Sequence, residues 1–176
     1  MDNIVLIGYM GSGKTTVGKY ICEKYGYGFV DTDEYIVNNE RMSINEIFEK
    51  KGEAYFRDLE TETIKKLAET LSKTIISTGG GLPVKVENEA YLKALGKVYY
   101  LKTDADTIYK RVSEDNSRPL LKGDDLHNKI CTMLNAREPR YIACANYVIE
   151  IGADTSIQDI ADTIVSLQSQ STSQTK

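Results

Sequence analysis

The chain has 176 residues, of which 41% are hydrophobic and 27% charged, and its formal net charge is −4 at pH 7, so it can form one globular domain with a core. The negative charge argues against a nucleic-acid-binding protein with a basic surface, and no apolar run is long enough to span a membrane. The three cysteines are widely spaced and the first expected strand begins near residue 3, without room for a signal peptide, so we expect a cytoplasmic protein with reduced thiols.

A phosphate-binding loop follows this first expected strand. Residues 8–15 read Gly-Tyr-Met-Gly-Ser-Gly-Lys-Thr, which fits G-x-x-x-x-G-K-[ST], with an apolar run before it and helical spacing after it. The glycines let successive backbone N–H groups point into one concavity, to which the following helix adds partial positive charge. Lys14 is expected to reach the β- and γ-phosphates, and the Thr15 hydroxyl to ligate Mg²⁺. A chance match in a glycine-rich turn is the alternative; because strand, motif and helix agree, we predict a nucleoside-triphosphate site.

The rest of the chain alternates between strands and helices. We expect further strands at 29–31, 74–77, 97–101 and 147–150, with helices between and after them. A capping box at 43–46 starts a short helix, which Gly52 separates from a longer one at about 53–71. This alternation predicts a single α/β domain over residues 1–167, with a parallel sheet covered on both faces. The Ser/Thr/Gln-rich tail at 168–176 is expected to be disordered.

Two acids after the second expected strand favour a kinase over other P-loop proteins. A GTPase should carry Asn-Lys-x-Asp, whereas residues 128–131 read Asn-Lys-Ile-Cys, and the third strand ends at Ser77 without the carboxylate usual in motor-type ATPases. Asp31 and Asp33 instead follow a strand at the edge where open α/β sheets bind ligands. We expect one to hold a Mg²⁺-bound water and the other to take the proton of a substrate hydroxyl. The alternative is that Asp31 or Asp33 only caps a helix.

Two arginines are candidates for binding an anionic substrate. Arg137 shares a helical stripe with apolar residues and should therefore point inward, where a guanidinium needs an anion. Arg57 lies on the flank of the apolar stripe of its own helix. Together they could hold a carboxylate in forked geometry. The alternative for each arginine is a structural ion pair, for Arg57 with Glu53 or Glu60.

A long polar stretch and a run of glycines complete the candidates. Arg118 lies in the polar stretch at about 114–124, where a closing loop would exclude water and neutralise charge on the phosphates; a solvated surface arginine is the alternative. The run Gly79-Gly80-Gly81 at a strand end permits close backbone approach to a ligand, or else forms a flexible turn. His127, the only histidine, is expected to face solvent.

The motifs, taken together in their order along the chain, resemble those of the shikimate kinase family. The match runs from Ile4 to about Ile151. The P-loop alone specifies little, but the combination is highly specific. The matching segments are the P-loop with Thr16, Asp31-Thr32-Asp33, Ser43-Ile44-x-Glu46-Ile47-Phe48, Gly52-Glu53-x-x-Phe56-Arg57-x-x-Glu60, Thr78-Gly79-Gly80-Gly81, Arg118-Pro119-Leu120-Leu121 and Arg137-x-Pro139-x-Tyr141.

The resemblance implies transfer of the γ-phosphoryl group of ATP to the 3-hydroxyl of shikimate, a step of aromatic amino-acid synthesis, with Mg²⁺ as cofactor. It also implies a three-layer α/β/α P-loop fold with sheet order 2-3-1-4-5, a substrate-binding region at about 32–60 and a mobile lid at about 112–124. The implied catalytic residues are Asp33, Lys14 and Arg118. The implied ATP-binding residues are Gly11, Ser12, Gly13, Lys14, Thr15, Thr16, Arg111 and Arg118. Of these, Arg111 would lie against the adenine. The implied shikimate-binding residues are Asp33, Arg57, Gly79, Gly80, Gly81 and Arg137. The implied metal site consists of Thr15 and, through water, Asp31 and Ser77.

Some positions depart from the family pattern. Thr15 stands where many members have serine, Leu82 stands where a smaller residue is common, and the adenine-side loop near Gly152 matches no motif. Two alternative functions stay open: a P-loop kinase of another hydroxy acid such as gluconate, and a nucleotide-dependent switch without phosphoryl transfer, in which Asp33→Asn would leave function intact. The expected partners are small molecules only, without nucleic acid or membrane, and the expected state is a monomer.

Overall fold

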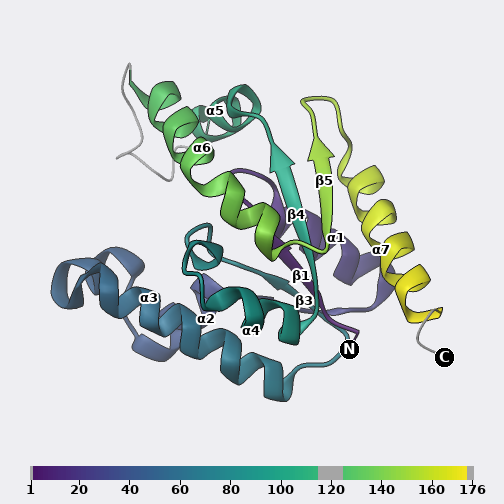
Figure 1. The fold of residues 1–176 in the computed structure, drawn as a ribbon, viewed down its shortest axis with the longest axis horizontal. Helices are drawn as coiled ribbons and strands as arrows, with labels where there is room; N and C mark the ends of the chain where they lie inside the picture. The colour runs from purple at the N-terminus through teal and green to yellow at the C-terminus, as the bar shows by residue number, and fades with distance from the viewer. Residues whose placement is uncertain (1, 115–124, 174–176) are drawn as a thin grey trace.

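The computed structural model describes residues 2–114 and 125–173, in which five strands form one sheet with helices on both sides (Figure 1). Every helix in these residues is too short or too polar to cross a membrane. The elements are β1 (Ile4–Ile7), α1 (Lys14–Tyr25), β2 (Gly28–Asp31), α2 (Thr32–Glu40), α3 (Ile44–Thr70), β3 (Thr74–Ser77), the 3-10 helix η1 (Leu82–Val84), α4 (Asn88–Leu95), β4 (Lys97–Thr103), α5 (Ala105–Glu114), α6 (Leu126–Cys144), β5 (Tyr147–Ile151) and α7 (Ile157–Ser173).

The sheet has the order β2-β3-β1-β4-β5, and all neighbouring strands are parallel. This confirms the expected order 2-3-1-4-5. In the register, Ser77 at the end of β3 is paired with Asp31 at the end of β2 and with Leu6 of β1. The carboxyl ends of the three strands therefore meet at one edge, which places the P-loop, Asp31 and Ser77 together.

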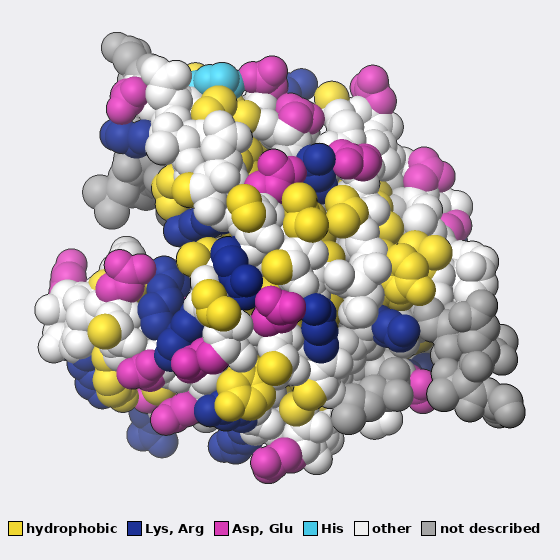
Figure 2. Space-filling view, viewed as in Figure 1, with side chains coloured by type: hydrophobic (Ala, Val, Ile, Leu, Met, Phe, Trp, Pro, Cys, Tyr) yellow, Lys and Arg dark blue, Asp and Glu magenta, His cyan; other side chains and the backbone are white. Residues whose placement is uncertain are grey.

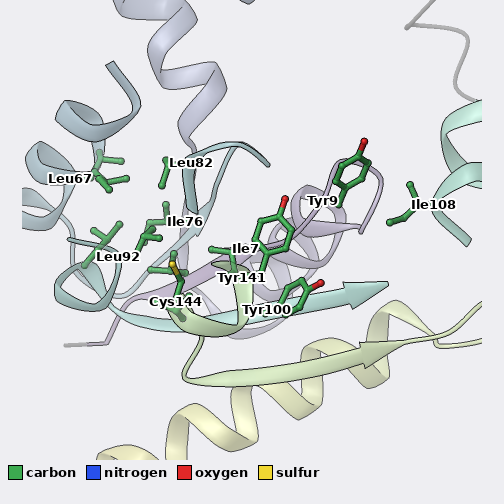
Figure 3. Packing of buried hydrophobic residues seen from close by; sticks show 14 of the residues in the cluster. Ile7, Tyr9, Leu67, Ile76, Leu82, Leu92, Tyr100, Ile108, Tyr141 and Cys144 are labelled. Carbon is green, nitrogen blue, oxygen red and sulfur yellow. The ribbon is translucent and has the colours of Figure 1, made fainter. Parts of the chain in front are cut away.

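The central strand β1 contributes to two hydrophobic layers because its side chains alternate between the faces of the sheet. Val5 and Ile7 belong to the cluster under α3, α4 and α6, whereas Ile4 and Leu6 belong to the cluster under α1 and α7. All four are fully buried, which contributes on the order of 2 kcal/mol each. Figure 3 shows part of the first cluster, where Leu82 lies near the sheet together with helix residues.

Helix α3 begins and bends where the sequence predicts. The Ser43 hydroxyl accepts the backbone N–H of Glu46 at 3.3 Å, and the Glu46 carboxylate accepts the N–H of Ser43 at 2.9 Å, which confirms the capping box. At Gly52 the backbone leaves the helix, with φ 85° and ψ 166°, so α3 consists of two segments. A small cluster of Ile36, Ile47 and Phe56 joins α2 to α3. These helices form a lobe beside the sheet (Figure 1).

The prediction that disorder begins at residue 168 is wrong for residues 168–173, because α7 continues through Ser173. Gln168 is 4% exposed, and its Oε1 accepts a hydrogen bond of 2.9 Å from the Tyr99 hydroxyl of β4. Burial of this hydrogen bond stabilises a segment whose composition alone predicts disorder. Residues 174–176 lie outside the described residues.

Candidate active site

The P-loop, residues 8–15, connects β1 to α1 and turns at glycines. Gly13, the residue before α1, has φ 92°, a left-handed conformation that favours glycine. Lys14 is 8% exposed and lies within the loop, where its ammonium group donates hydrogen bonds of 2.9 Å to the carbonyls of Gly8 and Tyr9. On α5, Arg111 donates to the Gly11 carbonyl at 3.2 Å. The structure therefore brings the expected phosphate-binding residues and Arg111 to one side of the loop.

Three oxygen-bearing side chains meet where β1, β2 and β3 end. The Thr15 hydroxyl donates to Asp31 Oδ2 at 3.2 Å and lies 3.4 Å from the Ser77 hydroxyl. Within the described part of the chain, no group of three or more His, Cys, Asp and Glu side chains forms a metal cage. Mg²⁺ needs none, because it keeps several waters and takes one or two carboxylates together with substrate phosphates. The oxygen-only set fits this ion.

Asp31 and Asp33 have different roles in the fold. Asp31 Oδ1 accepts the backbone N–H groups of Asp33 at 3.0 Å and Glu34 at 3.4 Å, so Asp31 is the N-cap of α2. The expected helix cap is therefore found at Asp31 and not at Asp33. Asp33 lies in the first turn of α2 and faces the same cavity as the P-loop.

This cavity has a volume of about 680 Å³, within the range of small-molecule sites. Figure 2 shows a hollow on this face between the lobe formed by α2 and α3 and the part formed by α5 and α6, with basic side chains at its edge. Residues of the P-loop line the cavity together with Arg57, Glu60 and Arg137. Apolar side chains that sequence reasoning did not assign to the site complete the wall: Met10, Ile44, Phe48, Phe56 and Val112.

Arg57 makes both of the ion pairs that the sequence left as alternatives. Its Nη1 donates to Glu60 Oε2 at 2.8 Å, and its Nη2 donates to Glu53 Oε1 at 2.9 Å. These pairs fix the guanidinium at the cavity wall. The ion pairs and a role in substrate binding are thus compatible.

Glu60 is a site residue that the sequence analysis did not assign. Its side chain is 1% exposed, and Oε1 has no hydrogen-bond partner among the described residues. Burial raises the pKa of Glu60 to about 7, since desolvation outweighs the opposing effect of Arg57, and Asp33 adds like charge. The sequence feature that could have identified Glu60 is its position three residues after Arg57 on the same expected helix, where the two side chains can pair.

Arg137, on α6, also lines the cavity. Its guanidinium carbon lies 5.8 Å from the centre of the Tyr9 ring, a cation–π distance. Tyr141, one helical turn further on, donates its hydroxyl to the Gly80 carbonyl at 2.7 Å. Burial raises the pKa of Tyr141 to about 12, and Arg137 opposes this shift. The two tyrosines hold the arginine beside the glycine run.

The glycine run makes room for side chains of the protein itself. A Cβ at Gly79 would collide with the Asp33 carboxylate, and a Cβ at Gly81 would collide with the Arg57 guanidinium. A Cβ at Gly80 would meet only ordinary contacts, the nearest at 3.4 Å. A side chain at Gly79 or Gly81 would therefore displace the end of a site residue's side chain, an effect that the sequence did not indicate.

Three other predicted features have different outcomes. Arg118 and residues 115–124 of the expected lid lie outside the described residues, while residues 112–114 continue α5. Leu82 is fully buried in the core and does not line the cavity, so it does not narrow the site. Gly152 also lies outside the lining of this cavity.

Comparison with known proteins adds independent findings. The family model described as "Shikimate kinase" matches residues 10–168. A curated shikimate kinase from Caldicellulosiruptor bescii is 42% identical over 161 residues, which cover 92% of this chain and 91% of that protein. The structure of shikimate kinase from Acinetobacter baumannii in complex with shikimate has a TM-score of 0.85 and 37% identity, covering 94% of this chain and 91% of that one. The structure of shikimate kinase from Bacteroides thetaiotaomicron has a TM-score of 0.83 and 34% identity, with coverage of 96% and 97%.

Proposed function

The chain belongs to the shikimate kinase family, and on that premise we propose how its own residues carry out ATP-dependent phosphorylation of shikimate. The cavity offers two sets of groups with different chemistry. The P-loop suits a triphosphate with Mg²⁺, and the two arginines suit an anionic acceptor. The observation that carries the proposal is that Asp33 lines the same cavity as the P-loop and both arginines.

Arg57 and Arg137 together bind the acceptor carboxylate. Arginine presents parallel N–H donors that match a carboxylate, and these charge-assisted hydrogen bonds are stronger than neutral ones. Before the substrate binds, the ion pairs with Glu53 and Glu60 already position Arg57, and the contact with the Tyr9 ring positions Arg137. Pre-positioning of this kind lowers the entropic cost of binding.

Asp33 accepts the proton of the attacking hydroxyl. The hydroxyl oxygen forms its new bond to the γ-phosphorus while the bond to the bridging oxygen of ADP breaks, and the released proton passes to the Asp33 carboxylate. The space left by Gly79 lets this carboxylate lie against the glycine run. Asp33 therefore fixes where the accepting hydroxyl must lie.

The metal site is proposed from its donor set. Thr15 would bind Mg²⁺ directly, and Asp31 and Ser77 would hold waters of the ion. When bound, Mg²⁺ neutralises charge on the phosphates. Lys14 contributes a second positive charge on the same side of the P-loop.

The remaining assignments rest on the sequence. Arg118 as the lid arginine, Arg111 against the adenine, and residues 1–167 as one kinase domain stay predictions. The monomeric state and the cytoplasmic location also stay predictions.

The test is a coupled assay of ADP release with ATP, Mg²⁺ and shikimate, with gluconate and a reaction without acceptor alongside. We expect release that depends on shikimate, and a loss of about 10- to 150-fold in kcat/KM for shikimate in Arg137→Ala, the range for losing hydrogen bonds to a charged group. Arg140→Ala is the matched control, because Arg140 lies on the same helix but pairs with Glu89 at 3.3 Å, outside the cavity lining. ADP release no greater with shikimate than without acceptor would refute the proposed role of the site, and equal losses in both variants would refute the carboxylate clamp.

A further inference from the structure

A cysteine, a histidine and an aspartate form a hydrogen-bonded chain on α5 and α6, away from the active-site cavity. Asp106 Oδ1 lies 2.6 Å from His127 Nε2, and His127 Nδ1 lies 3.7 Å from Cys131 Sγ. His127 and Cys131 are four residues apart on α6 and so lie on the same helix face. The Tyr109 ring meets the imidazole edge-on at 5.5 Å. An aspartate at Nε2 favours the tautomer in which Nδ1 can accept a proton from the thiol.

Cys131 lines a second cavity of about 470 Å³, which shares no lining residue with the active-site cavity. Its walls are the carboxyl ends of β4 and β5 and one face of α6. Thr103 lines the same cavity, is 4% exposed, and its hydroxyl has no hydrogen-bond partner in residues 2–114 and 125–173. A buried hydroxyl without a partner costs free energy, so this wall is incomplete without a ligand group that hydrogen-bonds to it.

The charge of the cavity indicates what kind of ligand it accepts. Asp104, Glu138 and Glu150 lie in its wall, with Lys102 as the only basic residue in the lining. Lys102 is shared between Glu138 and Glu150, at 3.3 Å from each. Three acids against one base leave the wall negative, which favours a cation.

Among the residues that the structure describes, no imidazole lies beside either of the other two thiols. Cys22 Sγ donates to the Gly28 carbonyl at 3.2 Å, and burial raises the pKa of this thiol. Cys144 is fully buried, and burial raises its pKa as well. A carbonyl cannot take the thiol proton, whereas an imidazole can. Cys131 is therefore the thiol with a base beside it and a cavity in front of it.

We propose that Cys131 is a modification site that undergoes thiol–disulfide exchange with small cationic disulfides, and that the second cavity holds the transferred half. His127 takes the thiol proton, and the Cys131 sulfur attacks one sulfur of the disulfide. The new S–S bond forms as the old one breaks, and the departing thiolate receives the proton from His127. One disulfide replaces another, so no further oxidant is required.

The test uses the reduced full chain and cystamine, a small disulfide with two ammonium groups, and measures rate constants of adduct formation at each cysteine by mass spectrometry. We expect Cys131 to react at least about tenfold faster than Cys22, because Cys131 has a base beside its sulfur and lines a cavity. His127→Gln should lower the rate at Cys131 to near that of Cys22, and Thr103→Val should slow it without changing Cys22. Melting temperatures of the variants show whether they remain folded.

Cys22 serves as the internal control in every reaction, and an anionic disulfide, dithiodiglycolate, tests the class of ligand. We expect cystamine to react faster than dithiodiglycolate at Cys131, with the difference shrinking as salt screens the charges. Equal rates at Cys131 and Cys22, or an unchanged rate at Cys131 in folded His127→Gln, would overturn the proposal. A faster reaction with the anionic disulfide would overturn the assignment of a cationic ligand.

Discussion

Replacement of Glu60 by glutamine should make the stability of the protein less sensitive to pH. The pKa of Glu60 rises from an ordinary value of 4.5 to about 7 on folding. Between these values the folded state keeps a proton that the unfolded chain has lost, so the stability contributed by this residue falls as the pH rises and levels off above the folded pKa. Glu60→Gln cannot ionise and should avoid this loss.

The magnitude follows from the shift. A difference of about 2.5 pKa units corresponds to about 3 kcal/mol at 1.36 kcal/mol per unit, of which about 2 to 3 kcal/mol develops between about pH 5 and pH 8. The side chain is 1% exposed, so solvent does little to screen this cost. The stability of Glu60→Gln relative to wild type should therefore rise by this amount over that range.

Urea unfolding of both proteins at several pH values measures this difference directly. Other titrating groups are present in both proteins and largely cancel. Glu62→Gln is the matched control, because Glu62 is exposed on the same helix. The reasoning would be refuted if the difference in the free energy of unfolding between Glu60→Gln and wild type stayed constant to within about 0.5 kcal/mol across the range. It would also be refuted if this difference changed with pH equally for Glu62→Gln.

Three further substitutions test the site and the fold. Gly81→Ala should displace Arg57 and raise the KM for shikimate at least about tenfold, with little change in the KM for ATP. In the same steady-state assay Gly80→Ala should raise the KM for shikimate less, and equal effects of the two substitutions would contradict the packing argument. Asp33→Asn should lower kcat by about 10²- to 10⁴-fold while calorimetry shows ATP bound as before, and retained turnover would exclude its role as base. Gln168→Ala should cost about 1–3 kcal/mol in urea unfolding, because it leaves a buried tyrosine hydroxyl of β4 without its partner; no change would contradict an ordered helix end.

The sequence determined those features that depend on neighbouring residues. The P-loop, the capping box at Ser43 and the break at Gly52 are each specified within a few residues, because they depend on local hydrogen bonds and backbone conformation. The alternation of apolar strands and amphipathic helices determined the α/β class in the same way. The family resemblance then supplied the order of the strands, which local patterns do not contain.

Only the tertiary structure decided features that depend on contacts between distant segments. Asp31, and not Asp33, caps α2, and Gly79 and Gly81 are glycines because Asp33 and Arg57 occupy the space beside them. Glu60 has a raised pKa because the fold buries it beside another acid. Its identity alone predicts an ordinary, exposed carboxylate.

Two segments in the second half of the chain also have contacts that their own residues do not predict. The composition of residues 168–173 predicts disorder, yet burial of Gln168 against β4 extends the helix. His127 was expected only to face solvent, and the packing of α5 on α6 places Asp106 of α5 beside its ring. Local sequence sets the conformation of a segment, but burial and long-range hydrogen bonds are set by what the fold places next to it, and those neighbours cannot be read from the segment itself.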